Sequence, residues 1–172
     1  RPEIAVFLGD ANPRIVTEAA RAINDLPISG AMVRLASLAS QPLDPQNAAL
    51  GRRVINPNYR FGTRETAAAL AQVASREGVE AYRVEALDAL AAWPRNSGRD
   101  RVSGLWRPTA FARDARVPAE ALQPVVSTLV ASGPNSVRAA AARAAGSLKL
   151  RSAGPALAEL ILQKQGDGVA RT

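Results

Sequence analysis

The chain contains neither histidine nor cysteine, and this double absence removes whole classes of chemistry. It cannot form a Ser-His-Asp triad, a thiol nucleophile, a zinc cluster of the usual ligands, a CxxCH haem attachment or a disulfide. A hydrolase that uses carboxylates alone is one remaining possibility. Glu18 and Glu85 occupy equivalent positions of the repeat described below, about 20 Å apart if each hairpin adds about 10 Å, whereas glycosidase carboxylates lie about 5–9.5 Å apart. We therefore expect inter-repeat ion pairs there, with Arg21 or Arg53, and no catalytic, cofactor-binding or metal-ligating residue.

Aromatic residues are also scarce: the 172 residues include two Trp, two Tyr and three Phe, against 36 alanines. Strands favour aromatic and β-branched side chains, whereas alanine is the strongest helix former. The composition therefore predicts an all-α fold.

Long apolar runs are missing as well. No stretch approaches the roughly 18 residues that a membrane span needs, and no signal peptide is visible. The first expected helix, Glu3–Leu8, begins almost at the first residue. We therefore expect the chain to be a fragment of a longer protein, with any targeting signal outside it.

Three stretches align without a gap and indicate an internal repeat: IVTEAARAINDL from Ile15, YRVEALDALAAW from Tyr82 and VRAAAARAAGSL from Val137. Apolar residues recur at offsets 0, 4, 7, 8 and 11, which is the buried stripe of an amphipathic helix. Alanine at the middle offsets allows another helix to approach closely. Leucines at offsets 20 and 23 then predict a second helix, so each unit is expected to be a helical hairpin.

A fourth, weaker copy starts at Leu50. Its first helix is expected to be short or broken near Asn56, because Gly51 and Pro57 lie inside it. The copies start at residues 15, 50, 82 and 137, so the third unit carries about twenty extra residues. We place this long inserted loop at about 94–117, followed by a displaced second helix, Ala119–Ala131. The expected repeats span about 12–40, 44–75, 79–132 and 134–163, within a single domain that covers 1–172.

A period in the thirties, built from helical hairpins, is typical of α-solenoids. The stretches DANPRIVTEAARAI and SGPNSVRAAAARAAGSL resemble HEAT-type repeats, especially the short bacterial kind, in which Asp or Asn plus Pro opens a helix. Asn12 and Pro13 fit the N-cap and the first helical position. The resemblance implies a right-handed α-solenoid of about four HEAT-like hairpins.

Two further stretches, RRVINPNYRFGT at 52–63 and WPRNSGRDRVSGLWRP at 93–108, resemble a narrower group. They look like the helical-repeat segment of large bacterial exported proteins that join a sugar-dehydrogenase-like β-propeller, a HEAT-like region and a c-type haem domain. This resemblance implies a periplasmic or otherwise exported oxidoreductase as the parent protein. Its quinone cofactor and haem would belong to flanking domains, so no catalytic position carries over to this chain.

The net charge of +7 comes from two segments, and it comes from arginine, since 20 of the 22 basic residues are arginine. Residues 51–64 hold four arginines and no acidic residue, and residues 94–117 hold six arginines and two aspartates. Because the segments belong to consecutive repeats, they could share one edge of the solenoid. The candidate interaction surface comprises Arg52, Arg53, Asn58, Tyr59, Arg60, Arg99, Asp100, Arg101, Trp106 and Arg107.

Each segment also has a purely structural interpretation. Trp106 and Phe111 could cover helix faces while Arg99, Asp100 and Arg101 form ordinary ion pairs. Tyr59 and Phe61 could likewise pack on neighbouring repeats. A long loop needs an apolar anchor to stay ordered, so we expect Trp106 to pack inward and to leave Arg99 and Arg107 exposed.

Three functions compete. The first is a non-catalytic scaffold, spacer or protein-interaction module whose partner is a flanking domain or another subunit. The second is nucleic-acid binding, because some DNA-repair glycosylases are built from HEAT-like repeats with a basic concave surface and a Trp near an Asp, and Asp100 precedes Trp106 by six residues. Scarce lysine and loop-borne charge disfavour it. The third, a carboxylate-only hydrolase, has no suitable pair of acids, so the chain is expected not to be an enzyme.

Overall fold

The computed structural model describes residues 1–95, 98–109 and 113–169, and within these ranges the chain is helical and contains no strand. The all-α prediction is confirmed. The α-helices are α1 (Pro13–Asp25), α2 (Ser29–Ser37), α3 (Ala48–Phe61), α4 (Arg64–Ser75), α5 (Glu80–Ala92), α6 (Arg116–Leu122), α7 (Val126–Ser132), α8 (Asn135–Leu148) and α9 (Gly154–Val169). Short 3-10 helices are η1 (Pro2–Gly9), η2 (Leu38–Ser40), η3 (Trp93–Arg95) and η4 (Arg151–Ala153).

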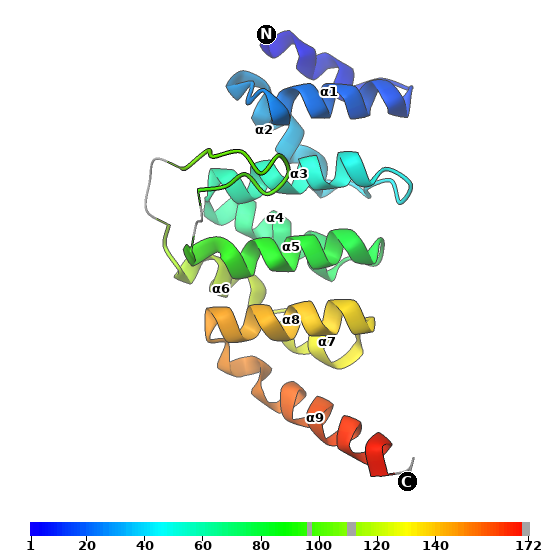
Figure 1. The fold of residues 1–172 in the computed structure, drawn as a ribbon, viewed down its shortest axis with the longest axis vertical. Helices are drawn as coiled ribbons and strands as arrows, with labels where there is room; N and C mark the ends of the chain where they lie inside the picture. The colour runs from blue at the N-terminus through cyan, green and yellow to red at the C-terminus, as the bar shows by residue number, and fades with distance from the viewer. Residues whose placement is uncertain (96–97, 110–112, 170–172) are drawn as a thin grey trace.

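The helices form two layers that follow the order of the chain (Figure 1). In the front layer α1, α3, α5 and α8 lie one below the next and point the same way, so their C-terminal ends share one edge, on the left in Figure 1. Each packs on the one before: α3 on α1, α5 on α3 and α8 on α5. Helices α2, α4 and α7 pack behind, each against the front helix that follows or precedes it.

The repeat stripe forms the core between these layers. Tyr82, Ala86, Leu90 and Trp93 of the α5 unit are buried, as are the matching small residues of α8. Burial of these residues in close-packed helix seams is the main favourable contribution to folding. The first unit departs most from the pattern among the described residues, because Ile15 and Leu26 at the two ends of its stripe are exposed, whereas Leu50, Phe61 and Leu148 are partly buried.

Helix α3 corrects the expectation of a short or broken helix, since it runs unbroken through Gly51 and Pro57. Gly51 is required by packing, because a Cβ there would lie 2.3 Å from the Tyr82 ring. Pro57 supplies no helical N–H, and the helix nevertheless continues through it. Asn58 beside it donates from its side chain to the Val54 carbonyl at 2.9 Å. The same Nδ2 reaches Ala36 of α2 and ties the two helices together.

The expected helix Ala119–Ala131 is wrong in the opposite sense, because it is two helices, α6 and α7, separated by a turn at residues 123–125. Pro124 has no N–H to donate, and its ring crowds the carbonyl four residues earlier. The segment Glu3–Leu8 is a 3-10 helix, η1, rather than an α-helix. Asn12 caps α1 as predicted, accepting the Arg14 amide at 3.0 Å.

Arginines at helix ends join successive elements. Arg83 and Arg138 occupy the same offset in their repeats, and each donates to a carbonyl in the last turn of the preceding helix, Ala74 and Val130 respectively, at 2.9 Å. Arg76 donates to the carbonyls that end η2. The last carbonyls of a helix lack internal partners and carry partial negative charge, so a guanidinium there stabilises the helix.

No helix in the described part of the chain combines the length and the apolar character that crossing a membrane requires.

Two glycines inside helices should respond oppositely to alanine. Gly51→Ala should destabilise the fold by about 1–3 kcal/mol, because the new methyl group overpacks against Tyr82. Gly146→Ala in the last turn of α8 meets open space and should stabilise it by up to about 1 kcal/mol. Urea unfolding followed by circular dichroism measures both, and a stabilising Gly51→Ala would contradict the observed packing.

Candidate interaction surface

Part of the insertion folds into a short hairpin over residues 98–107, which lies across the front of α3 (Figure 1). The Asp100 amide donates to the Leu105 carbonyl at 2.9 Å, and the Arg107 amide donates to the Gly98 carbonyl at 2.7 Å. Gly104 closes the turn with φ +70°, a left-handed conformation that glycine adopts without strain. We call residues 98–107 the arginine hairpin.

Asp100 anchors the arginine hairpin from inside and is only 3% exposed. One carboxylate oxygen accepts the amides of Val102 and Ser103 and the Ser103 hydroxyl, at 2.8–3.0 Å. The other accepts Asn56 Nδ2 at 2.9 Å and lies 3.5 Å from Arg60 Nη1. The carboxylate therefore both shapes the turn and fixes the hairpin to α3.

The Asp100 carboxylate is stabilised in its ionised form although it is buried. Burial by itself raises the pKa of Asp100, but the hydrogen bonds from Ser103, Asn56 and Val102 outweigh it, and the pKa lies below its ordinary value. Donors from the protein thus replace the water that the carboxylate loses. The ionised form is the one that holds the hairpin.

A chain of polar side chains continues from Asp100 to α1. Asn56 Nδ2 donates to Asn24 Oδ1 at 2.8 Å, and Asn24 Nδ2 donates to Asp25 Oδ1 at 2.9 Å. Arg53 forms a two-pronged pair with Asp25, with Nε–Oδ1 at 3.1 Å and Nη2–Oδ2 at 2.7 Å. Burial raises the pKa of Asp25, and the hydrogen bonds from Arg53 and Asn24 bring it below its usual value. The network links α1, α3 and the hairpin.

The arginines of this region serve the C-terminal ends of helices. Arg107 donates to the carbonyls of Asn24 and Asp25 in the last turn of α1. Arg113 donates to the Arg60 carbonyl in the last turn of α3 at 3.5 Å. Because the front helices point the same way, their partial negative ends gather at this edge. The basic insertion therefore neutralises the edge that it covers.

Aromatic side chains hold the base of the insertion. Tyr59 and Trp93 meet edge to face with ring centroids 6.1 Å apart. The Arg113 guanidinium lies 4.2 Å from the Tyr59 centroid and 5.0 Å from that of Trp93, and Arg101 lies 5.5 Å from Tyr59. Burial lowers the pKa of Arg113, because desolvation opposes its charge. The ring faces supply attraction to the cation in place of an acid.

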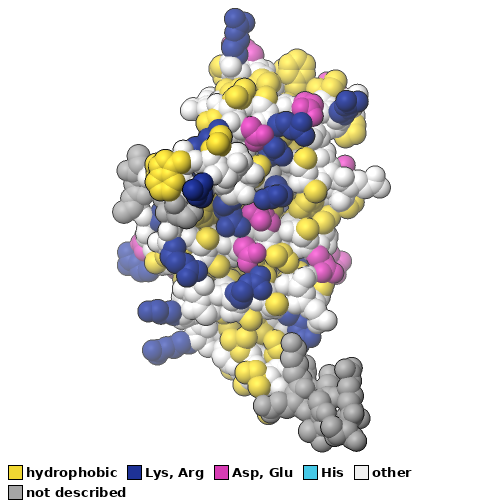
Figure 2. Space-filling view, viewed as in Figure 1, with side chains coloured by type: hydrophobic (Ala, Val, Ile, Leu, Met, Phe, Trp, Pro, Cys, Tyr) yellow, Lys and Arg dark blue, Asp and Glu magenta, His cyan; other side chains and the backbone are white. Residues whose placement is uncertain are grey.

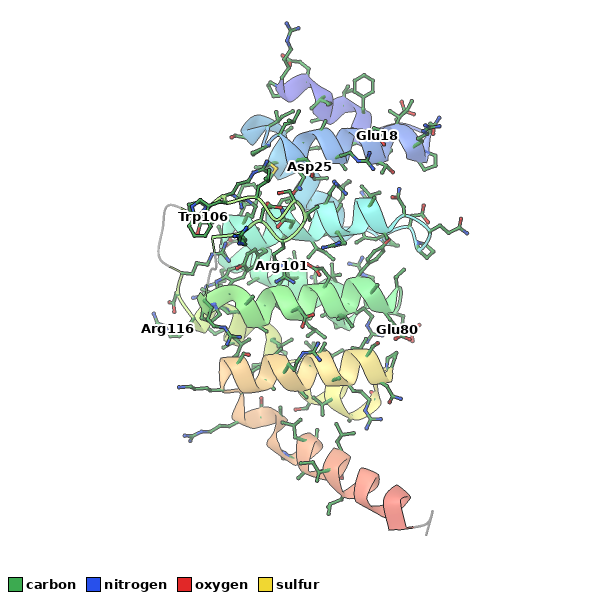
Figure 3. All side chains as sticks on the ribbon, viewed as in Figure 1. Glu18, Asp25, Glu80, Arg101, Trp106 and Arg116 are labelled. Carbon is green, nitrogen blue, oxygen red and sulfur yellow. The ribbon has the colours of Figure 1, made fainter. Side chains whose placement is uncertain are left out.

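Trp106 corrects the expectation that it packs inward, because it is 68% exposed and lies at the outer end of the hairpin, away from the helices (Figure 3). A Cβ at Gly98 would lie 2.7 Å from the Trp106 ring, so one part of the indole rests on the Gly98 backbone. Leu105 beside it is also exposed. The apolar anchor of the insertion is Trp93 instead, which is fully buried.

The two basic segments do come together, but as a bonded network. Arg52 donates to the Arg101 carbonyl, Arg60 donates to the Arg107 carbonyl, and Arg101 pairs with Glu85 of α5 at 3.0 Å. Arg99 and Arg107, expected to be exposed and available, differ: Arg107 is half-buried on α1, and Arg99 is exposed but donates to the Gly104 carbonyl. Of the predicted set, Asn58, Tyr59 and Asp100 are buried.

Sequence reasoning missed several members of this network. Asn24, Asp25, Asn56, Trp93 and Arg113 all contribute to it. The available signal was the pair Asn24-Asp25 at the end of a helix, at offsets 9 and 10, where two other copies carry the small residues Ala91-Ala92 and Gly146-Ser147. Phe111, assigned a packing role, lies outside the described residues.

The remaining acidic residues behave as structural partners. Glu18 pairs with Arg21 within α1 at 3.4 Å, and Glu85 pairs with Arg101 of its own repeat. Both glutamates therefore form ion pairs, but the prediction that these pairs join different repeats is wrong. Arg53 pairs with Asp25 rather than with either glutamate. Among the described residues no group of three or more acidic side chains is placed to hold a metal ion.

Asp100→Asn tests the carboxylate. The new amide would face the donors of Asn56 and Arg60, so we expect a loss of about 1–3 kcal/mol at pH 7. Because the pKa of Asp100 is lowered from 3.8 in the folded state, its stabilisation is present above about pH 4 and is lost as the pH falls through the folded value. Urea unfolding between about pH 7 and 2.5 should therefore show a shallower acid loss in the variant.

The matched control is Asp44→Asn, which removes an exposed carboxylate and should change stability at pH 7 by less than about 0.5 kcal/mol. Equal effects of the two changes would show that Asp100 does not anchor the hairpin.

The two tryptophans form a second matched pair. Trp93→Ala should destabilise the fold by about 3–5 kcal/mol, because it empties a fully buried site. Trp106→Ala should cost less than about 1 kcal/mol, because the side chain is mostly in solvent. Thermal unfolding measures both, and a large loss for Trp106→Ala would restore the interpretation of this residue as an inward anchor.

Comparisons of the chain with protein-family models, with curated proteins and with solved structures returned no match. The function is therefore argued from the geometry above.

Proposed function

We propose that this chain is a non-catalytic HEAT-like α-solenoid module that acts as a scaffold, spacer or protein-interaction domain, with the arginine hairpin as its contact element. The proposal rests on helices that stack in chain order and devote their small-residue stripes to packing. It is also supported by the composition, since neither histidine nor cysteine is present to supply the commonest catalytic groups.

The observation that carries the proposal is an exposed tryptophan on a firmly held hairpin. The hairpin is bonded to α1 through Arg107, to α3 through Asp100 and to α5 through Arg101. Trp106 at its outer end is 68% exposed. Tryptophan is enriched among the residues that dominate binding energy, and a contact held in place before binding loses little entropy when it binds. A structural anchor would be buried, as Trp93 is.

The rival function, nucleic-acid binding, is favoured by the net charge of +7 and the sequence pI of about 11.1. The arrangement of the charge argues against it. Arg53, Arg60 and Arg101 pair with acids, and Arg107 is bonded to the end of α1. Figure 2 shows acidic side chains interspersed with the basic ones over the front helices. Phosphate contacts would have to compete with these internal bonds.

The wider context is part of the proposal. We place the chain in a larger, exported or periplasmic oxidoreductase-like protein, in which the partner is a flanking domain or another subunit. The two stretches at 52–63 and 93–108 support this context by resemblance alone. The flanking sequence tests it directly: propeller blade repeats upstream or a CxxCH motif downstream is the expected finding.

The interaction itself is tested with a photo-crosslinking amino acid placed at position 106 or at position 33. Val33 is as exposed as Trp106 but lies on α2, away from the hairpin, and is the matched control. We expect position 106 to yield a specific protein adduct in the source cells. The purified partner should then bind Trp106→Ala at least about tenfold more weakly than the parent chain, and Val33→Ala equally well.

Two results would overturn the proposal. One is a partner whose affinity ignores Trp106→Ala. The other is binding of a DNA or RNA duplex at micromolar protein that weakens steeply between low and moderate salt, with log K falling by about 0.9 per phosphate contacted. The second result would establish the rival function.

A further inference from the structure

Helix α1 exposes positions that its counterparts bury. At the first position of the stripe Ile15 is 41% exposed, whereas Tyr82 and Val137 are buried. At offset 7 Ala22 is half-buried, whereas Ala89 and Ala144 are fully buried. Helices α5 and α8 pack against the preceding hairpin, and the Tyr82 ring lies against Gly51 of α3. The same stripe in α1 therefore forms an inter-helix seam that is only partly filled.

Helix η1 fills one half of that seam. It packs on both α1 and α2, just as α4 packs on the front helix α5 and on α6 behind it. It thus takes the place of the second helix of a hairpin. Among the described residues no front-layer helix lies beyond α1 on that side (Figure 1).

An open apolar groove of about 590 Å³ marks the unfilled half, and it is lined by Ile4, Phe7, Arg14, Ile15, Glu18, Ala19 and Ala22. Phe7 of this lining is exposed, as is Val6 next to it in the sequence. Figure 2 shows hydrophobic side chains gathered at this end of the molecule. A mostly apolar groove between two helices, with small residues along its floor, has the shape that accepts a third helix.

The polar residues at offset 6 of the front helices indicate the charge that a docked helix should carry. At offset 6, α8 carries Arg143, which pairs with Asp88 of α5 at 3.2 Å. At the same offset α3 carries Asn56, which donates to Asn24 of α1. Both are donors that reach back to the preceding front helix. In α1 the residue at this offset is Arg21, which is about half exposed and pairs only within its own helix, with Glu18.

We infer that the groove between η1 and α1 is a docking site for one amphipathic α-helix of the α5 kind, lying parallel to α1. Its seam consists of alanine-sized residues facing Ile15 and Ala19, and it carries a carboxylate opposite Arg21. This surface lies on α1, apart from the arginine hairpin, and the inference stands without the proposed function.

The charge pattern disfavours a second copy of this chain as the occupant. The front helix at the other end of the stack, α8, contains no Asp or Glu and two arginines. Helix α8 therefore offers no carboxylate at the position that Asp88 occupies in α5, although the neighbouring α9 carries the exposed Glu159. Helix α5, which does carry the acid, is buried between α3 and α8.

The test uses a fluorescent, hydrocarbon-stapled peptide of residues 80–92, shown to be helical by circular dichroism, because an unstapled helix of this length is marginal in water. Anisotropy titration with the whole chain should give saturable binding below about 1 mM. Ile15→Glu should weaken binding at least about tenfold. Arg21→Glu should weaken binding of the parent peptide about fivefold. A peptide with Asp88→Arg should restore the affinity for the Arg21→Glu chain, and it should not do so for the parent chain.

Val33→Glu, at an equally accessible position on α2, is the matched control and should leave binding unchanged, as should Trp106→Ala. Thermal unfolding of each variant confirms that it folds. Absence of saturable binding, or affinity that ignores both Ile15→Glu and the charge exchange, overturns the inference. So does concentration-dependent dimerisation, in sedimentation velocity, that Ile15→Glu abolishes, since the occupant would then be a second copy.

Discussion

Close packing of alanine-rich front helices that all point the same way is the constraint on which the rest of this structure depends. Alanine seams let α1, α3, α5 and α8 approach one another, and their shared direction brings their C-terminal ends to one edge. The partial negative charges of those ends add up instead of cancelling. Such an edge requires donors, and the arginine-rich insertion lies there with Arg107 on α1 and Arg113 on α3.

This arrangement gives the basic composition a structural meaning. Arginine rather than lysine is suited to the task, because a rigid fork can serve two carbonyls or both oxygens of a carboxylate at once. Arg107 does the first at Asn24 and Asp25, and Arg53 does the second at Asp25. A large net charge therefore coexists with a surface on which many arginines are engaged. These bonds stabilise the contacts between successive hairpins. The prominent exposed group of the insertion is the Trp106 ring.

Particular residues show how far local rules reach. Asn12 and Pro13 cap and open α1 as the rules for helix N-termini predict. Two prolines inside predicted helices behaved differently: Pro124 follows the end of a helix, whereas Pro57 lies inside α3, where the residues on both sides of it are buried in the packed interior. For the same reason the anchor of the insertion could not be identified from composition. Trp93 lies at offset 11 of the repeat stripe and is buried beside the Tyr59 ring, whereas Trp106 belongs to no repeat position and its exposure appears only in the structure.

The sequence by itself determined the helical class, the hairpin repeat, the position of the insertion and the two basic segments. Each of these follows from residue counts or from the spacing of apolar residues, which depend on local sequence alone. It did not determine which arginines are engaged. That depends on which carbonyls and carboxylates of distant segments lie within hydrogen-bond reach, and residues 83 positions apart, such as Asn24 and Arg107, meet only once the hairpins are stacked. The exposure of Trp106 and the partly filled seam of α1 were likewise decided by tertiary packing. The burial of a side chain depends on which other residues pack around it, and the type of residue does not determine that.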